Sequence, residues 1–285
     1  MQRWSPRVTD LAGGLQVRRV LPVAARRAVG PFVFFDHFGP VTLPPEADTD
    51  VGPHPHIGLA TLTYLFEGTM VHRDSTGAVQ RIEPGEINWM TAGRGVEHSE
   101  RTPDELRGTL RRTHGLQFWV ALPEAHETDE PSFAHTPASA VAELILGGAT
   151  LRVLVGTGFG ATSPVRTLSP TLLVAIDAAA GAALAIPDAA DERALYGVDQ
   201  SFELDGVAVP ARTLAVLAPG ATPVLNASAA ARIVLVGGQT LGRRFMSWNF
   251  VSSRRERIVA AREDWVAQRF PPVPGENEFV PLPSR

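Results

Sequence analysis

Two pairs of metal-binding side chains constrain this chain more than any other feature. His54 and His56 stand two residues apart, and so do His98 and Glu100. On a β-strand, residues two apart point to the same face, so each pair can direct two ligands at one point. The sequence therefore predicts two strands that meet around a single ion, with His54, His56, His98 and Glu100 as its ligands.

The predicted ligand set limits the chemistry of the site. Three neutral imidazoles and one carboxylate suit a borderline divalent first-row metal such as iron, nickel, copper or zinc. The chain contains no cysteine, which excludes a thiolate site, an iron–sulfur cluster and a disulfide. A lone histidine is more often an ordinary core or surface residue, but two such pairs in strand-like sequence favour a metal site.

Composition excludes two classes of partner. The formal net charge is −4, and arginine gathers only in short clusters. A dedicated nucleic-acid surface needs a concentrated basic field, so we expect no direct nucleic-acid binding. No apolar run reaches the roughly 18 residues of a membrane-spanning helix, and the N-terminus lacks the apolar core of a signal peptide. These features predict a cytoplasmic protein that does not enter a membrane.

Short apolar runs separated by glycine and proline indicate an all-β fold. Segments 60–66, 115–120 and 214–217 are rich in residues that favour strands, and turn signals occur at 74–77, 83–85 and 218–220. Strands of this length, at this spacing, are typical of antiparallel sandwiches and barrels. We therefore expect β-barrels rather than a helical or mixed architecture.

The chain also resembles a degenerate internal duplication. When Tyr64 is aligned with Tyr196, the first histidine pair falls opposite Ile186 and Asp188. All eight histidines occur at or before position 135, so the second half cannot rebuild a histidine site. The sequence thus predicts two similar β-domains, of which only the first holds the metal.

The predicted domains cover residues 1–135 and 136–285, and one helix is expected near the end of the second. The segment 253–256 has the form of a capping box. Apolar residues then recur at helical spacing, and two prolines follow. We expect this helix over about 253–270 as a packing element, with an apolar face formed by Ile258, Ala261, Trp265 and Val266.

The remaining candidate residues have structural interpretations. His37 is expected to be a hydrogen-bonded packing residue, and His72 or His114 could orient a ligand histidine. His126 and His135 lie in a polar connection and are expected to be exposed. Three acidic side chains are interpreted as structural or solvated: Asp36, Asp74 and Glu97. Four large apolar residues are expected in the core, with one or two at a cavity wall: Phe66, Trp89, Met90 and Trp119.

These residues carry a resemblance to a known family. In order along the chain, the matching motifs occupy residues 30–40, 53–58, 89–95, 98–100 and 248–253. They resemble the pirin family of the cupin superfamily, in particular its bacterial quercetinase-like members. The resemblance covers nearly the whole chain, and its motifs are far more specific than a single pair of histidines.

The resemblance implies a bicupin, with two tandem cupin barrels (double-stranded β-helices, or jelly rolls) and a C-terminal helix. It also implies one divalent metal, Fe(II) first and Ni, Cu, Mn or Zn as alternatives, on His54, His56, His98 and Glu100. Many pirins have arginine and glutamate where this chain has Ile57 and Ala60. These changes make the expected cavity entrance less polar.

Two functions follow from the resemblance, and both stay open on sequence alone. The first is a dioxygenase similar to quercetin 2,3-dioxygenase, which opens a flavonol ring with O2 and releases CO, with Glu100 as the catalytic proton acceptor. The alternative is an iron-dependent, redox-sensing regulator that binds a transcription factor or a metabolic enzyme. A zinc or nickel centre with another cupin chemistry is a third possibility, because a fold hosts many reactions.

Overall fold

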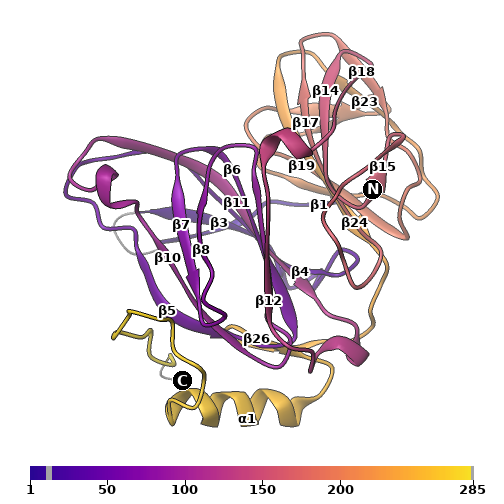
Figure 1. Cartoon of the computed structure of the whole chain (residues 1–285). Helices are drawn as coiled ribbons and strands as arrows, with labels where there is room; N and C mark the ends of the chain where they lie inside the picture. Colours follow the sequence, from indigo (N-terminus) through magenta and orange to yellow (C-terminus); the bar gives the residue numbers. More distant parts are fainter. Residues whose placement is uncertain (11–14, 284–285) are drawn as a thin grey trace. The chain divides into compact units, whose positions relative to one another are not determined.

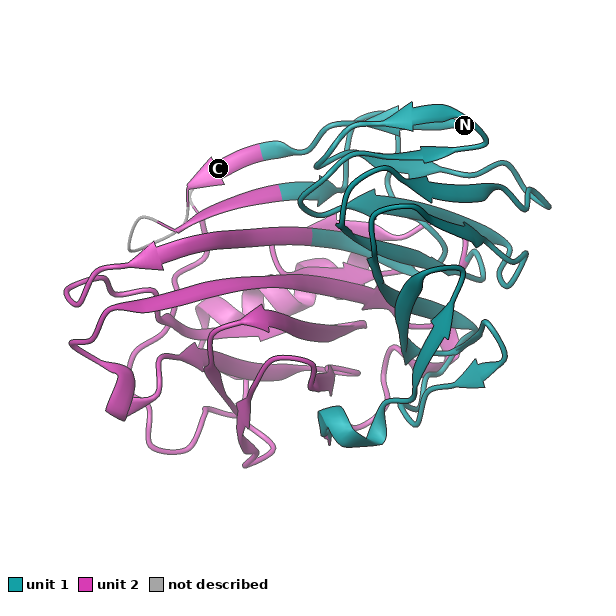
Figure 2. Ribbon diagram, turned by 90° about the horizontal axis from the view of Figure 1, so that it is seen from above, with its two compact units in different colours: residues 1–7, 19–35, 136–240 teal, residues 8–18, 36–135, 241–285 magenta. Residues whose placement is uncertain are grey.

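The computed structural model describes residues 1–10 and 15–283, whose regular secondary structure is mostly β-strand (Figure 1). Two compact units share the chain (Figure 2). One contains residues 1–7, 19–35 and 136–240, and the other contains residues 8–18, 36–135 and 241–285. We call them the C-terminal barrel and the metal barrel, after the sequence halves that dominate them. The all-β prediction is confirmed.

The metal barrel contains a seven-stranded and a four-stranded antiparallel sheet. The order of the large sheet is β12-β9-β6-β11-β4-β3-β2, and that of the small sheet is β5-β10-β7-β8. The boundary between the units falls within β3 and β4. The strands are β2 (Arg7–Asp10), β3 (Gln16–Leu21), β4 (Phe32–Leu43), β5 (Val51–His56), β6 (Leu59–Glu67), β7 (Met70–Asp74), β8 (Val79–Ile82), β9 (Ile87–Thr91), β10 (Val96–Arg101), β11 (Arg111–Ala121) and β12 (Ser132–Thr136).

The C-terminal barrel repeats this plan. Its large sheet has the order β1-β22-β19-β24-β17-β14-β13, and its small sheet has the order β18-β23-β20-β21. Tyr64 on β6 and Tyr196 on β19 both lie on the third strand of their sheets, as the duplication predicts. The strands are β1 (Gln2–Trp4), β13 (Glu143–Leu146), β14 (Ala149–Val155), β17 (Thr171–Ala178), β18 (Ala182–Ala185), β19 (Glu192–Gly197), β20 (Phe202–Leu204), β21 (Val207–Val209), β22 (Leu214–Val216), β23 (Val224–Ala227) and β24 (Ala231–Gly238). A separate two-stranded sheet joins β15 (Thr157–Gly158) and β16 (Ala161–Thr162).

Aliphatic side chains fill the interior of the C-terminal barrel. In the small sheet, β18 occupies the edge position that β5 occupies in the metal barrel. Its inward residues Ala182 and Leu184 are buried in a continuous apolar core, and so is Ile186, which follows the strand. Burial of apolar surface stabilises this barrel where the other barrel places polar groups. Among the described residues, the polar interior thus lies in the metal barrel, and the C-terminal barrel has an apolar one.

The first strand and the segment that follows residue 240 each belong to the barrel that the other half of the chain dominates. β1 pairs with β22, and its Gln2 lies opposite Val216 in the C-terminal barrel. Residues 241–285 belong to the metal barrel, where they form β25 (Phe245–Ser247), β26 (Phe250–Ser252) and the helix α1 (Arg255–Val266). The predicted domains 1–135 and 136–285 instead assign β1 to the first domain and β25, β26 and α1 to the second. As domains, these two ranges stay a prediction.

The predicted helix is present, but it begins and ends differently. Among the described residues, α1 is the one α-helix, with Arg254 at its N-cap and no side-chain cap. The expected capping box does not form, because the Ser253 hydroxyl donates to the Glu127 carboxylate instead. Ile258, Ala261 and Trp265 are buried as predicted, whereas Val266 is exposed. No helix in the described part of the chain is long and apolar enough to cross a membrane.

Candidate metal centre

One face of the small sheet in the metal barrel carries the predicted ligands. His98 on β10 lies directly opposite His54 on β5, and His56 follows two residues later on β5. On the other side of β10, His98 lies opposite Asp74 and Glu100 lies opposite His72, both on β7. Because side chains alternate along a strand, all six of these groups share one face of the sheet.

Strand β5 is suited to an edge position. It carries Pro53 and Pro55, which have no N–H to donate, and proline in a sheet is confined to edges and bulges. The register also shifts there: His54 and Val51 are three positions apart on β5, while their partners His98 and Glu100 are two positions apart on β10. Such a bulge changes the direction of neighbouring side chains. It falls beside the ligand pair.

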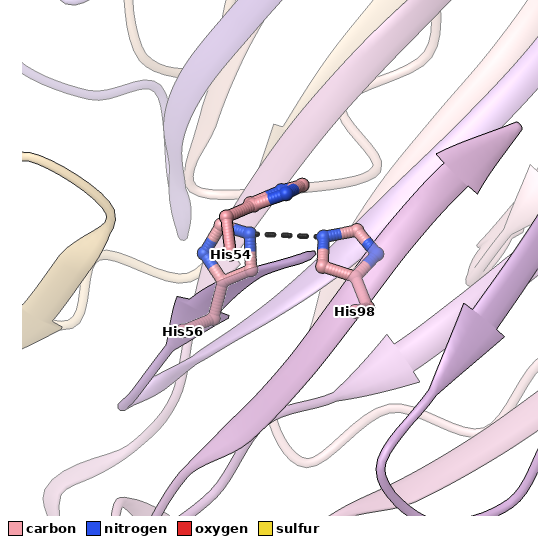
Figure 3. Close-up of side chains that lie close together, drawn as sticks. All are labelled: His54, His56 and His98. Atoms are coloured by element: carbon pink, nitrogen blue, oxygen red, sulfur yellow. Dashed lines mark hydrogen bonds between the residues drawn. The ribbon is translucent and has the colours of Figure 1, made fainter. Parts of the chain in front are cut away.

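The three histidine rings converge. One ligand nitrogen from each of His54, His56 and His98 lies within 4.8 Å of the others, and all three residues are buried. His56 Nε2 and His98 Nε2 are 3.1 Å apart, a pair marked by the dashed line in Figure 3. Two nitrogens bound at about 2.1 Å to one ion lie about 3.0 Å apart at a right angle and about 3.4 Å apart in a tetrahedron. The observed separation fits both geometries.

Hydrogen bonds on the far side of two rings set their tautomers. His54 Nδ1 is 2.9 Å from the Gly52 carbonyl oxygen, and His56 Nδ1 is 3.1 Å from the Asn249 carbonyl oxygen. A carbonyl oxygen only accepts, so Nδ1 donates in both rings, and a neutral ring then keeps its lone pair on Nε2. Both lone pairs are therefore available to a metal.

A chain of side chains orients the third ring. His72 Nε2 donates to Asp74 Oδ2 at 2.9 Å, and His72 Nδ1 lies 3.4 Å from His98 Nδ1. With Asp74 accepting from His72 Nε2, the Nδ1 lone pair of His72 can accept from His98 Nδ1, and this arrangement leaves His98 Nε2 for the metal. Two lone pairs facing each other at 3.1 Å repel, and a cation between them removes that repulsion. The donor set therefore fits a metal ion.

Burial keeps the three rings neutral. Desolvation lowers the pKa of His54 to about 4, although its hydrogen bond to Gly52 opposes the shift. The pKa values of His56 and His98 are also lowered well below the usual histidine value, first by desolvation and then by neighbouring histidines. Neutral imidazole is the form that binds metal, so these rings are ready to act as ligands near neutral pH.

Glu100 differs from the histidines. It lies on the ligand face of β10, but among the described residues the close group of ligand atoms contains the three histidines and not Glu100. Its residue surface is partly exposed, while desolvation of its carboxyl group raises the pKa to about 7. A divalent cation nearby would favour the carboxylate. The role of Glu100 as fourth ligand stays a prediction.

The other histidines have separate surroundings. His37 and His114 are buried with their Nε2 atoms 2.9 Å apart, so His114 is a hydrogen-bonding neighbour of His37. His126, predicted to be exposed, is partly exposed and pairs with Asp129. His135 is only partly exposed and lies 2.8 Å from the Asn88 side-chain oxygen.

Two orienting groups were not predicted from the sequence. Asp74 was interpreted as structural, and its Oδ1 does accept from Thr76 and Ala78 in a turn, while its Oδ2 orients His72. The i, i+2 spacing of His72 and Asp74 was a usable signal, because it matches the spacing of the ligand pairs. The Asn249 carbonyl had no signal, since every residue carries one.

Aromatic rings flank the cluster. Trp119 on β11 meets His56 edge to face, with ring centroids 5.1 Å apart, so one of the predicted core aromatics does lie against a predicted ligand. Phe133 on β12 stacks on His72 at 4.5 Å. These contacts restrict ring rotation and keep the cluster in an apolar surround.

The opposite face of the small sheet has another character. A groove of about 820 Å³ there is lined by arginines of alternate strand positions (Arg73, Arg81, Arg101) and by Gly275–Glu278. Glu97 points to this side, where burial and the charge of Glu276 raise its pKa to about 7. The groove is therefore separated from the histidine cluster by the sheet itself.

Comparisons with known proteins agree with this architecture. A sequence model of the pirin family matches residues 14–120, and one of the pirin C-terminal cupin domain matches residues 173–271. A pirin-like protein of Caulobacter vibrioides is 46% identical over 95% of this chain and 96% of its own length. The chain therefore belongs to the pirin family.

Solved structures extend the comparison. A quercetin 2,3-dioxygenase from Acinetobacter baumannii is 33% identical, with a TM-score of 0.92 over 100% of this chain and 95% of that chain. The bacterial pirin YhhW from Escherichia coli, solved in complex with nickel(II), is 18% identical, with a TM-score of 0.66 over 84% of this chain and 100% of its own. At that identity the second likeness shows the fold alone. The family models and the first structure together show two cupin-type domains.

Asp74→Asn is expected to weaken metal binding about 10- to 100-fold, the usual effect of losing a group that orients a ligand histidine. The amide nitrogen would face the His72 Nε2–H donor, and His72 would no longer accept from His98. Metal affinity is measured by competition with a chelator. Asp129→Asn, which alters an exposed aspartate that also accepts from a histidine, is the matched control. Equal affinities in the two variants would contradict the orienting role.

The low pKa of His54 makes stability pH-dependent. The unfolded chain binds a proton at this residue below about pH 6.5, but the fold resists it until about pH 4, so acidification through this window favours unfolding. In metal-stripped protein, the free energy of unfolding should fall by up to about 1.4 kcal/mol per pH unit more in the wild type than in His54→Asn. Urea unfolding between pH 7 and 5 measures both. Parallel pH dependences would show that His54 is protonated equally in both states.

Proposed function

We propose that this chain is a mononuclear metal-dependent dioxygenase that opens a flavonol-type ring with O2 and releases CO. The observation that carries the proposal is the convergence of His54, His56 and His98 on one point, with their Nε2 atoms directed inward. The 33% identity to a quercetin 2,3-dioxygenase across the whole chain supports the substrate class. Fe(II) is the proposed metal, with nickel, copper, manganese and zinc as alternatives.

When bound, the metal supplies Lewis acidity that lowers the pKa of a coordinated hydroxyl group. The chain supplies the remaining parts. The three histidines would hold the ion by their Nε2 atoms, and their Nδ1 hydrogen bonds keep the rings from turning. Burial of the cluster excludes bulk water, which strengthens every electrostatic interaction within it.

Glu100 is the proposed acceptor of the substrate's hydroxyl proton. It lies two residues beyond His98 on the same face of β10, so its carboxyl group can reach a molecule bound at the histidines. A pKa of about 7 suits a group that takes and returns a proton near neutral pH. We also propose Glu100 as the fourth metal ligand, either before or after it accepts the hydroxyl proton.

An aromatic wall suits a planar substrate. Trp119 packs beside His56, whereas Ile57 packs with Phe250 and Ile258 of the C-terminal segment, so it does not line the cluster as the sequence suggested. Apolar pockets with a few convergent polar groups are typical of small-molecule sites. A flavonol would enter such a site with its rings against apolar side chains and its hydroxyl group toward the metal.

The proposal predicts that metal-loaded protein consumes quercetin and releases CO when O2 follows an anaerobic titration. Glu100→Gln should lower kcat about 100-fold or more, as expected for loss of a general base. Glu97→Gln is the matched control, because Glu97 has a similar pKa but points to the other face of β10. Absorbance at the flavonol band and trapping of CO measure both reactions.

Failure of the fully metallated wild type to consume any flavonol would contradict the enzymatic proposal. Metal- and redox-dependent binding of a protein partner, without turnover, would then favour the regulatory alternative. An equal loss of activity in both glutamate variants would contradict the assigned role of Glu100.

A further inference from the structure

A strained turn from the C-terminal segment holds the second histidine. Strands β25 and β26 form a hairpin in which Ser247 pairs with Phe250, so the turn consists of Trp248 and Asn249. Trp248 has a φ of +53°, a left-handed conformation that is unfavourable for a residue with a Cβ atom. Such a conformation persists only when its surroundings enforce it. The next residue supplies the carbonyl that accepts from His56 Nδ1.

The hairpin lies directly against the end of β5. The Val251 N–H donates to the Ile57 carbonyl at 3.2 Å, and Phe250 forms a parallel bridge with Ile57. Gly58 has a φ of +66°, and a Cβ atom there would lie 2.1 Å from the Val251 carbonyl oxygen. This close backbone approach fixes the distance between the turn and His56, which precedes Ile57.

Glu127 anchors the hairpin from the other side. It is 1% exposed, and its carboxylate accepts from the Ser252 hydroxyl at 2.6 Å and from the Ser253 N–H at 2.7 Å. Arg244 and Arg257, which flank the hairpin in sequence, form ion pairs with the same carboxylate at 3.3 and 3.2 Å. One buried charge thus holds both ends of the hairpin.

The loop that carries Glu127 also meets the second ligand strand. The Asp129 carbonyl accepts from the Arg94 N–H at 2.9 Å, and a Cβ atom on Gly93, whose φ is +50°, would lie 2.0 Å from that oxygen. This turn leads into β10 and His98. The Gly93 carbonyl in turn accepts from the Gly58 N–H at 2.9 Å. The hairpin and the turn before β10 therefore both bond to the loop that carries Glu127, and Gly58, just beyond the end of β5, bonds to that turn.

We propose that Glu127 is a positioning residue of the metal centre, which acts through the Trp248–Asn249 turn on His56. The carboxylate holds the hairpin, the hairpin presents the Asn249 carbonyl, and that carbonyl fixes the tautomer and direction of the His56 ring. The inference rests on the metal centre of the proposed function and is independent of its substrate. It makes the C-terminal segment a working part of a site whose ligands all come from the N-terminal half.

The test uses full-length protein and Co(II), whose visible absorption reports the ligand geometry. Affinity is measured by competition with a chelator. Glu127→Gln keeps the size of the side chain but removes the charge that two arginines and two serines share. It should lower Co(II) affinity about tenfold or more, a loss typical of residues that orient metal ligands, and it should alter the absorption bands. Glu127→Asp, which keeps the charge, should restore part of both.

Two controls separate positioning from general damage. Glu130 lies on the same loop as Glu127 and forms an exposed ion pair with Arg94. Glu130→Gln alters that ion pair and should leave the Co(II) affinity and spectrum unchanged. Leu235→Ala creates a cavity in the core of the C-terminal barrel and should lower the unfolding temperature without changing the Co(II) spectrum. Ser252→Ala, which removes one hydrogen bond to Glu127, is the milder variant if Glu127→Gln does not fold, and it should lower affinity severalfold.

The outcomes are distinct. If Glu127→Gln, or Ser252→Ala in its place, binds Co(II) with wild-type affinity and spectrum, the positioning role is wrong and the metal centre stands. If Leu235→Ala changes the spectrum as much as the Glu127 variant, the effect is only loss of stability, and the positioning role is wrong. If the wild type itself binds no Co(II), the proposed metal centre fails, and the positioning role fails with it.

Discussion

The site depends on hydrogen bonds made by the ring nitrogens that face away from its centre. A free imidazole can present either nitrogen, and a buried ring without a partner on one side would be both mobile and costly. Here the Gly52 and Asn249 carbonyls and the His72 ring each occupy the Nδ1 side of one histidine. Three Nε2 lone pairs are thereby directed at one point, and burial keeps them free of protons. That arrangement is what makes the cluster fit a metal ion.

The two barrels solve the same packing problem in different ways. The C-terminal barrel fills its interior with aliphatic side chains, including Leu184 on β18, the strand equivalent to β5, and Ile186, which follows that strand. The metal barrel places histidines there and must satisfy each of their nitrogens. Residues 241–285 supply part of that satisfaction, because the hairpin that carries Asn249 belongs to this barrel. The segment therefore completes the polar interior that the duplicated fold alone would leave open.

Local sequence patterns predicted the local parts of this structure. The i, i+2 spacing of His54 and His56 placed both on one face of a strand, and glycine and proline marked many of the turns. The helix near the end was predicted from its periodicity, but Ser253 binds Glu127, far away in sequence, and so the expected cap does not form.

Contacts between distant segments were beyond the reach of such patterns. Nothing in residues 2–4 indicates that they pair with β22, and nothing in Asn249 distinguishes its carbonyl from any other. Asp74 has two roles, one in a turn and one as the partner of His72, and the sequence pattern of a turn aspartate does not distinguish them. The role of Glu100 lies between these cases, because its strand face was predictable while its distance from the ion depends on the loaded site.

A crystal structure of metal-loaded protein, with anomalous diffraction measured at the metal's absorption edge, tests the central claim most directly. The account predicts one strong peak in the metal barrel, about 2.0 to 2.2 Å from the Nε2 atoms of His54, His56 and His98. Coordination through Nδ1, or a peak elsewhere with the three rings turned apart, would contradict it.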